Sequence, residues 1–403
     1  EITCRDWSSD VCSSDLQTVG AIGPAGRQLL LRHPATKTQM ERFDGLTSSL
    51  TAIRTETLMI RLKDIAERAG VSIMTVSKAL RDAPDISEAT KLRLRALASE
   101  MGYVPDSLAQ GLRTRNSRLL GLVISTITNP VFARMMLAIE EKATAAGYEL
   151  LLAHSLNEPE REAAALRRFI ARRVEGILVA PVYRLNQSAE VYDEVQRCGI
   201  PTVILGHRTS FCNRFCGVET DDLQGSAIAT RHLLALGHRR IAFLAGPAAS
   251  PWARERLEGF NRALREADIE PDDRLVFSAG ATIEEGEKAA LQLLHETTGV
   301  TAVQAVNDFV AIGAAEMLKR QEIRVPEEMS VIGYGDILMS GHYRVPLTTI
   351  HQPKFRLGET AMDLMLQAIR GVRPESRRLP VSLVVRSSTE LCRSEPGVLA
   401  VPV

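Results

Sequence analysis

The chain has 403 residues, of which 45% are hydrophobic and 24% are charged. This length allows two or three packed domains, since single cores rarely exceed about 250 to 300 residues. Its 49 basic and 49 acidic residues cancel, so overall charge gives no support to a nucleic-acid role, which must rest on local charge.

Cysteine usage and hydropathy narrow the class of protein further. No apolar run approaches the roughly 20 residues that a membrane span needs, and no basic segment followed by an apolar stretch opens the chain. We therefore expect a cytoplasmic protein with no membrane contact. Of the six cysteines only Cys212 and Cys216 are close, without a second pair to complete a zinc site, so we expect no metal and no cofactor.

The first 58 residues show no sustained periodicity. Their opening stretch repeats itself as SSDVCSSDL between Ser8 and Leu16, like translated vector or adapter sequence. We predict that residues 1–58 are a disordered or artefactual extension, and they carry no part of the functional argument.

Residues 59–104 carry three helical patterns separated by short breaks. An apolar face at helical spacing spans residues 62–69, Gly70 is expected to end that helix, and Ser72 to cap the next. A third helix begins near Ser87 and stops at Gly102. Two short helices joined by a glycine-containing turn and braced by a third form a helix-turn-helix, whose second helix enters the major groove of double-stranded DNA.

The second helix should expose side chains suited to DNA: apolar groups for thymine methyls, hydroxyls for phosphates, and a lysine for a guanine edge or a phosphate. These candidates are Ser72, Ile73, Met74, Thr75, Ser77 and Lys78. Residues 61–118 contain eleven basic and seven acidic residues, a net charge of +4. On charge alone a solvated helical face is an equally good explanation, and the helix spacing favours DNA binding.

The head resembles the lactose-repressor (LacI/GalR) family, whose heads run close to IKDIAxxAGVSxxTVSxxL. Here LKDIAERAGVSIMTVSKAL begins a nearly continuous match from Leu62 to Leu112. The resemblance implies that residues 105–118 hold a hinge helix and linker, and that Leu112 of each subunit of a homodimer is wedged into the minor groove, where it kinks the DNA. Without the resemblance, Leu112 would be expected to pack internally.

Two residues of the head depart from the family pattern, and a third weakens the hinge helix. Arg81 and Asp106 each stand where an asparagine is common, and Gly111 lowers helix propensity by up to about 1 kcal/mol. These departures bear on hinge stability and on operator sequence rather than on architecture.

From residue 119 to residue 390 short apolar runs alternate with amphipathic helices, which predicts an α/β fold of parallel sheets with helices on both faces. The second set of runs begins after CGVETDDLQGS, so we expect two similar Rossmann-like lobes, followed by a tail at 391–403. The resemblance continues through this region and implies a periplasmic-binding-protein-like domain that binds an effector and dimerises. The runs are LLGLVIS, YELLLAHS, GILVAP, PTVILG, RRIAFLAG, LVFSAG, TAVQAVND and MSVIGYGD.

Ligands of parallel sheets bind outside the carboxyl ends of the strands. The family resemblance implies Arg254 and Asp308 as effector contacts, with Asn129 and Phe132 lining the first lobe. Tyr183 and Asp336 are further candidates.

Other roles stay open for several of these candidates. Asp308 and Asp336 could each serve as a helix cap, Arg254 could be a surface charge paired with Glu258, and Phe132 could belong to the core. Ala281 falls where many relatives place an aromatic residue, which leaves room for an acyclic, acidic or phosphorylated ligand.

No nucleophile elbow, phosphate-binding loop or HExxH helix occurs in the sequence, so we expect no enzyme. A periplasmic sugar-binding protein shares the two-lobe body, but it has no use for a helix-turn-helix. The sequence thus predicts a transcription regulator, most often a repressor in this family, that is controlled by a sugar, sugar acid or related metabolite. The tail lacks leucine heptads, which favours a dimer over a tetramer.

Overall fold

The computed structural model describes residues 60–104, 116–185 and 188–393. These residues form two compact units, 60–104 and 116–393. No helix in the described ranges is long and apolar enough to cross a membrane. The extension at 1–58 and the hinge positions Asp106, Gly111 and Leu112 lie outside the described residues.

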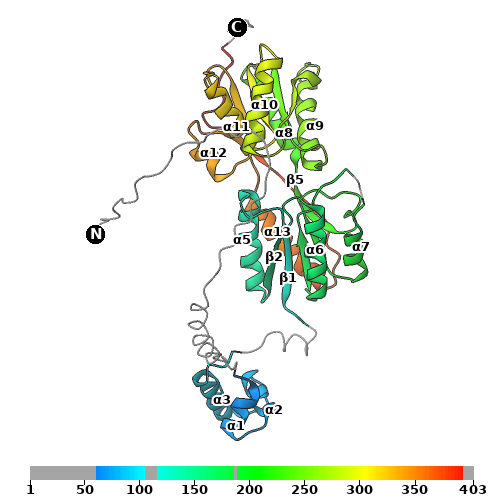
Figure 1. Ribbon diagram of the computed structural model, residues 1–403, viewed down its shortest axis with the longest axis vertical. Coiled ribbons are helices and arrows are strands. Elements are labelled where there is room, and N and C mark those ends of the chain that lie inside the picture. Colours follow the sequence, from blue (N-terminus) through cyan, green and yellow to red (C-terminus); the bar gives the residue numbers. More distant parts are fainter. Residues whose placement is uncertain (1–59, 105–115, 186–187, 394–403) are drawn as a thin grey trace, which may run out of the picture. The chain divides into compact units, whose positions relative to one another are not determined.

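The first unit is the predicted helix-turn-helix, built from α1 (Leu62–Ala69), α2 (Ile73–Leu80) and α3 (Glu88–Glu100) (Figure 1). Gly70 ends α1 in the left-handed conformation, with φ of 67°, which glycine adopts without strain. Ser72 and Ser87 cap α2 and α3 by accepting a backbone N–H in the first turn of each helix. The core consists of Ile65, Ala66, Val76, Ala79, Leu94 and Ala98.

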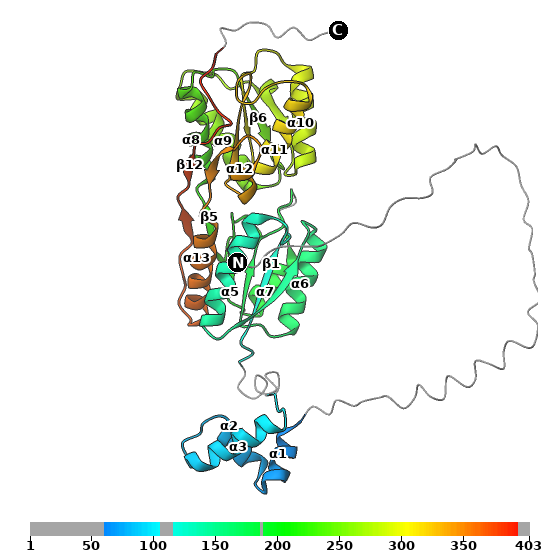
Figure 2. The ribbon, with the colours of Figure 1, turned by 90° about the vertical axis from the view of Figure 1, so that its left-hand side faces the viewer.

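The second unit consists of two lobes, each built on a six-stranded sheet. In lobe one the strand order is β11-β5-β4-β3-β1-β2, all parallel. Helices α5 and α13 cover one face of this sheet, and α6 and α7 cover the other (Figures 1 and 2). The elements are β1 (Leu119–Ile124), α5 (Pro130–Ala145), β2 (Glu149–His154), α6 (Pro159–Ala171), β3 (Gly176–Val179), α7 (Glu190–Arg197), β4 (Thr202–Leu205), β5 (Cys216–Thr220), α13 (Lys354–Ile369) and β11 (Arg377–Leu379).

Lobe two repeats the plan with the order β12-β10-β9-β8-β6-β7, in which only β12 is antiparallel to its neighbour. Helices α8 and α9 cover one face, and α10 and α11 cover the other (Figure 1). The elements are α8 (Asp222–Ala235), β6 (Ile241–Ala245), α9 (Pro251–Arg265), η1 (Asp273–Leu275), β7 (Val276–Ser278), α10 (Ile283–Glu296), β8 (Ala302–Ala305), α11 (Asp308–Arg320), β9 (Ser330–Gly335), α12 (Leu338–His342), β10 (Thr348–His351) and β12 (Ser382–Val384).

The eight predicted strands all form. Their Val, Ile and Leu runs are largely buried between helices on both faces of each sheet, except in the edge strand β2, where Leu152 is exposed. The pattern of apolar runs does not predict four further strands: β5, β10, β11 and β12. They carry threonine, glutamate, serine or arginine in place of a continuous apolar run, so hydrophobicity alone does not reveal them.

Within residues 116–393, as far as they are described, the chain passes between the lobes three times. The crossings lead from β5 to α8, from β10 to α13, and from β11 to β12. Each lobe is therefore completed by segments from distant parts of the sequence. The carboxyl ends of both sheets meet at these crossings, where ligands of open parallel sheets bind.

Helices α8 and α9 pack so closely that Gly259 has no room for a side chain. An added Cβ would lie 2.2 Å from the carbonyl oxygen of Leu223 and 2.9 Å from Cβ of Ser226.

We expect Gly259→Ala to lower the free energy of unfolding by about 1 to 3 kcal/mol, because backbone must shift to admit the methyl group. Urea unfolding followed by circular dichroism measures the change. Gly341→Ala is the matched control, since the nearest atoms to its Cβ lie 3.8 Å away on the Arg386 side chain. Equal unfolding midpoints for the two variants would show that α8 and α9 leave room for a methyl group at this position.

Candidate functional site

Helix α2 presents large apolar side chains to solvent. Ile73 is 49% exposed and Met74 is 59% exposed, while Val76 and Ala79 on the opposite side are fully buried. Exposed apolar groups beside hydroxyl and amino groups match what base and phosphate contacts in a major groove require. The surface of α2 is therefore consistent with the predicted DNA contacts.

The hydroxyl groups along α2 are oriented by hydrogen bonds within the first unit. Ser72 Oγ accepts from the Thr75 backbone N–H at 3.1 Å, and the two hydroxyls lie 2.9 Å apart. Arg81 donates from Nε to the Ser77 carbonyl at 2.9 Å and from Nη2 to the Ser77 hydroxyl at 3.2 Å. Arg81, which departs from the family pattern, thus orients one of the predicted contact residues.

Lys78 forms an ion pair with Asp85 across the turn that follows α2. This hydrogen bond holds the pKa of Asp85 below its ordinary value. Lys78 would have to exchange this carboxylate for a phosphate or a base edge on binding DNA. Leu112, the predicted minor-groove wedge, lies outside the described residues.

A cavity of about 360 Å³ lies between the two lobes. Its size falls within the range of about 300 to 1,000 Å³ that is usual for small-molecule sites, and its wall combines aromatic side chains with a few polar groups. Its wall includes Ser125, Asn129, Phe132, Asn157, Tyr183 and His207 from lobe one, Thr220, Asp222 and Gln352 at the crossings, and Ser250, Trp252, Arg256, Ala281, Asn307, Asp308 and Tyr334 from lobe two.

Three of the sequence candidates line the lobe-one side of this cavity: Asn129, Phe132 and Tyr183. Asn129 caps α5 by accepting the Val131 N–H at 3.0 Å, and Phe132 follows in the first turn of that helix. The Tyr183 hydroxyl donates to the carbonyl oxygen of His207 at 2.9 Å, and burial raises the pKa of Tyr183 well above its ordinary value. Hydrogen bonds and packing hold these side chains in place, and they form the lobe-one part of the cavity wall.

Asp308 lines the lobe-two side, but its carboxylate is already fully bonded within the protein. It accepts from Thr349 Oγ1 at 2.5 Å, Ser340 Oγ at 2.8 Å and the Ile337 N–H at 2.9 Å. Burial raises the pKa of Asp308 although all three bonds favour its charged form. Asp308 joins α11 to the ends of β9 and β10, and the cap of α11 is Asn307 instead.

Two other candidates lie away from the cavity wall. Asp336 is held by Arg386 at 2.6 Å and by His351 at 2.7 Å. Arg254 is exposed on α9, and its suggested partner Glu258 pairs with Arg265 at 3.3 Å. The structure therefore brings Asn129, Phe132, Tyr183 and Asp308 together around the cavity and leaves Arg254 and Asp336 outside it.

The arginine that does line the cavity is Arg256, two residues further along α9 and only 5% exposed. Its Nε and Nη2 donate to Asp222 Oδ1 at 2.9 and 2.7 Å, and its Nη1 donates to the Val306 carbonyl at 2.6 Å. Its guanidinium lies 3.6 Å from the Tyr334 ring centroid and 4.8 Å from that of Trp252. Helical spacing could have identified it, because Ala253, Arg256 and Phe260 share the buried face of α9.

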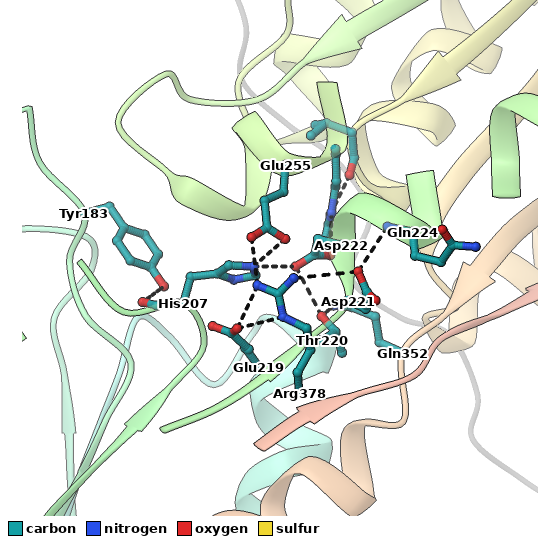
Figure 3. Close-up of polar contacts among 12 residues, drawn as sticks. Tyr183, His207, Glu219, Thr220, Asp221, Asp222, Gln224, Glu255, Gln352 and Arg378 are labelled. Carbon is teal, nitrogen blue, oxygen red and sulfur yellow. Dashed lines mark hydrogen bonds and ion pairs between the residues drawn. The ribbon is translucent and has the colours of Figure 1, made fainter. Parts of the chain in front are cut away.

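The sequence patterns also do not reveal the polar groups at the crossings, which Figure 3 shows. Gln352 donates to Thr220 Oγ1 at 3.0 Å, and Thr220 donates to Asp222 Oδ2 at 3.2 Å. His207 lies two residues after the end of β4, so the rule that ligands bind at carboxyl ends of strands could have found it. Within the described ranges no three histidine, cysteine or acidic side chains form a metal-binding group.

Comparisons with known proteins find a matching family model for each of the two units. Residues 61–106 match the family model for bacterial regulatory proteins of the lacI family, and residues 230–389 match a periplasmic binding protein-like domain. Over 337 residues the chain is 31% identical to the HTH-type transcriptional repressor PurR of Photobacterium profundum, which covers 82% of this chain and 99% of the relative.

Solved structures show the same likeness. The lac repressor dimer bound to operator and the anti-inducer ONPF superposes with a TM-score of 0.73 at 30% identity, over 82% of this chain and 99% of that one. A LacI family regulator from Enterococcus faecium with bound ribose gives a TM-score of 0.61 at 30% identity, over 68% of this chain and all of that one.

Arg254 and Arg256 of α9 allow a matched test of which of these two side chains is structural. Arg256→Ala leaves Asp222 buried without its cation, so we expect a loss of about 3 to 5 kcal/mol of unfolding free energy. Arg254→Ala removes an exposed charge and should change stability by less than about 0.5 kcal/mol. Urea unfolding at neutral pH measures both, and a large loss for Arg254→Ala alone would reverse the assignment.

Proposed function

The chain belongs to the LacI family of bacterial regulatory proteins, DNA-binding repressors with an effector-binding domain, and from this premise we propose how it acts. It binds a pseudo-palindromic operator as a cytoplasmic homodimer and changes its operator affinity when a small molecule fills the cavity between the lobes. The relatives are transcriptional repressors and not enzymes. The observation that carries the proposal is the 360 Å³ cavity at the crossings, in a chain that also has an exposed α2.

The first unit reads the operator through α2 in this proposal. Ile73 and Met74 contact base edges, Ser72, Thr75 and Ser77 contact phosphates, and Lys78 contacts either. Leu112 enters the minor groove at the centre of the site. The exposure of Ile73 and Met74 supports this assignment, because large apolar groups are seldom left in solvent side by side without a partner surface.

An apolar groove on lobe one supports the homodimer. Met136 and Leu137 of α5 lie beside Leu150 and Leu152 of β2 in this groove. Leu137 and Leu152 are each about two-fifths exposed, at 41% and 42%. Strand β2 stands at the edge of its sheet, where unpaired backbone groups can pair with another chain. We propose that a second copy covers it, as the dimeric state of the related lac repressor suggests.

The charges around the cavity favour an uncharged effector over an acidic or phosphorylated one. Arg256 is the one lysine or arginine among the described lining residues, and Asp222 neutralises it. Glu219 and Asp308 add negative charge to the same wall. An anion would meet no free cation there, whereas hydroxyl groups could bond to the amides and carboxylates while Phe132 and Trp252 pack against apolar faces.

The DNA-binding proposal is tested by selection from random duplex DNA at near-physiological salt, followed by binding measurements with the sequence recovered. We expect a pseudo-palindrome. Met74→Ala should weaken binding to it about tenfold, since a base contact contributes about 1 to 3 kcal/mol. Leu92→Ala removes an exposed apolar residue of α3 and should leave affinity unchanged. Recovery of no sequence preference would overturn the proposal.

The effector class is tested with matched pairs of ligands: ribose and ribose 5-phosphate, glucose and gluconate, cytidine and cytidine monophosphate. In each pair that binds, we expect the uncharged member to bind at least about tenfold more tightly, a difference of about 1.4 kcal/mol. Isothermal titration calorimetry measures this for the wild-type chain. Tighter binding of an anionic member would contradict the charge argument.

A further inference from the structure

A cluster of charged side chains joins the two lobes beside the cavity (Figure 3). His207, Glu219 and Arg378 belong to lobe one, and Asp222 and Glu255 belong to lobe two. We call these five residues the interlobe cluster. His207, Glu219 and Asp222 also line the cavity, so the cluster and the cavity share a wall.

The contacts of the cluster run from one lobe to the other. His207 Nε2 lies 3.1 Å from Glu255 Oε2 and 3.5 Å from Asp222 Oδ2. Arg378 Nη2 lies 2.8 Å from Glu219 and 2.9 Å from Glu255. Glu255 of lobe two therefore contacts two side chains of lobe one: the guanidinium of Arg378, which is positively charged, and the imidazole of His207, which can be protonated.

Negative charge is in excess around the imidazole of His207. The carboxylates of Glu219, Asp222 and Glu255 face it, and Asp221 lies 3.8 Å from Arg378 at the edge of the cluster. The guanidiniums present are those of Arg378 and of Arg256, which is paired with Asp222. The hydroxyl of Tyr183 faces the His207 carbonyl and brings no charge. A proton on His207 reduces the imbalance.

Because His207 and Asp222 are buried, the interaction between their charges is strong. His207 is 5% exposed and Asp222 is 1% exposed, so water screens their interaction weakly. The Nε2 atom of His207 and Oε2 of Glu255 are buried and are not aligned for a regular hydrogen bond, so their attraction depends on the imidazole being charged. A neutral imidazole would leave Glu255 Oε2 buried without a compensating charge on that side.

The same groups move the titration of His207. Burial lowers its pKa, but the close contact with Glu255 and the charges of Asp222, Glu255 and Glu219 outweigh burial and raise the pKa above the ordinary value of 6.5. A raised pKa in the folded state means that His207 stabilises the fold fully below the unfolded value. That stabilisation is lost as the pH rises through the folded value.

We propose that a proton on His207 holds the two lobes in the arrangement seen here, so that loss of this proton loosens the interlobe cluster and the cavity beside it. The inference rests on the proposed function only in treating that cavity as the effector site. The lobe contact itself requires neither DNA nor effector.

Trp252 provides a reporter, since it lines the cavity from lobe two and is one of two tryptophans in the chain. In a Trp7→Phe background its emission reports the surroundings of the cavity wall. Between about pH 5.5 and about pH 9 we expect one transition, with a midpoint above the ordinary histidine value of about 6.5. His207→Gln should abolish this transition, while His295→Gln, which removes an exposed histidine, should leave it in place.

Glu255→Gln provides a second test in case His207→Gln fails to fold. It removes the lobe-two carboxylate nearest the imidazole, so the midpoint should move down toward about 6.5. An unchanged midpoint in Glu255→Gln, a transition that survives in His207→Gln, or flat emission in the wild type would each overturn the proposal. Failure to select an operator would leave these results untouched and would count against the proposed function alone.

Discussion

The buried ion pair between Arg256 and Asp222 is the contact on which the crossing region depends. Asp222 is the first residue of α8, directly after the chain leaves lobe one, and Arg256 lies on the buried face of α9. Their bonds of 2.7 and 2.9 Å fix α9 against the start of α8, and the bond of Arg256 to the Val306 carbonyl adds the end of β8. Removing either partner would leave a charge buried in a poorly solvated place.

This pair also decides the chemistry of the cavity. Because Asp222 neutralises Arg256, the described cavity wall offers an anion no unpaired lysine or arginine, which suits an uncharged ligand. Asp222 also faces His207, so the same carboxylate belongs to the cavity wall and to the contact between lobes. A molecule bound there touches the segments that set the position of one lobe against the other. Differential binding to two lobe arrangements is what a ligand needs in order to shift an equilibrium between them.

Much of the fold could be predicted from sequence, because it rests on local signals. Gly70 and the capping serines of α2 and α3 mark the helix-turn-helix, and continuous apolar runs mark the buried strands. The residues of the site are harder to predict from sequence, because which polar residues are buried depends on tertiary contacts. The sequence predicts that Asp308 binds the effector or caps a helix, whereas in the structure its carboxylate joins α11 to the ends of β9 and β10. The family motif indicates Arg254, whereas Arg256 lies on the buried face of α9.

Coupling between the cavity and operator binding is the central claim, and one measurement tests it directly. The affinity of the full chain for its selected duplex is measured by fluorescence anisotropy, with and without a ligand that calorimetry shows to saturate the cavity. Coupling of about 1 to 3 kcal/mol predicts a change in operator affinity of about 5- to 150-fold, in either direction. An operator affinity that stays constant while the cavity is saturated would contradict control of DNA binding from this site.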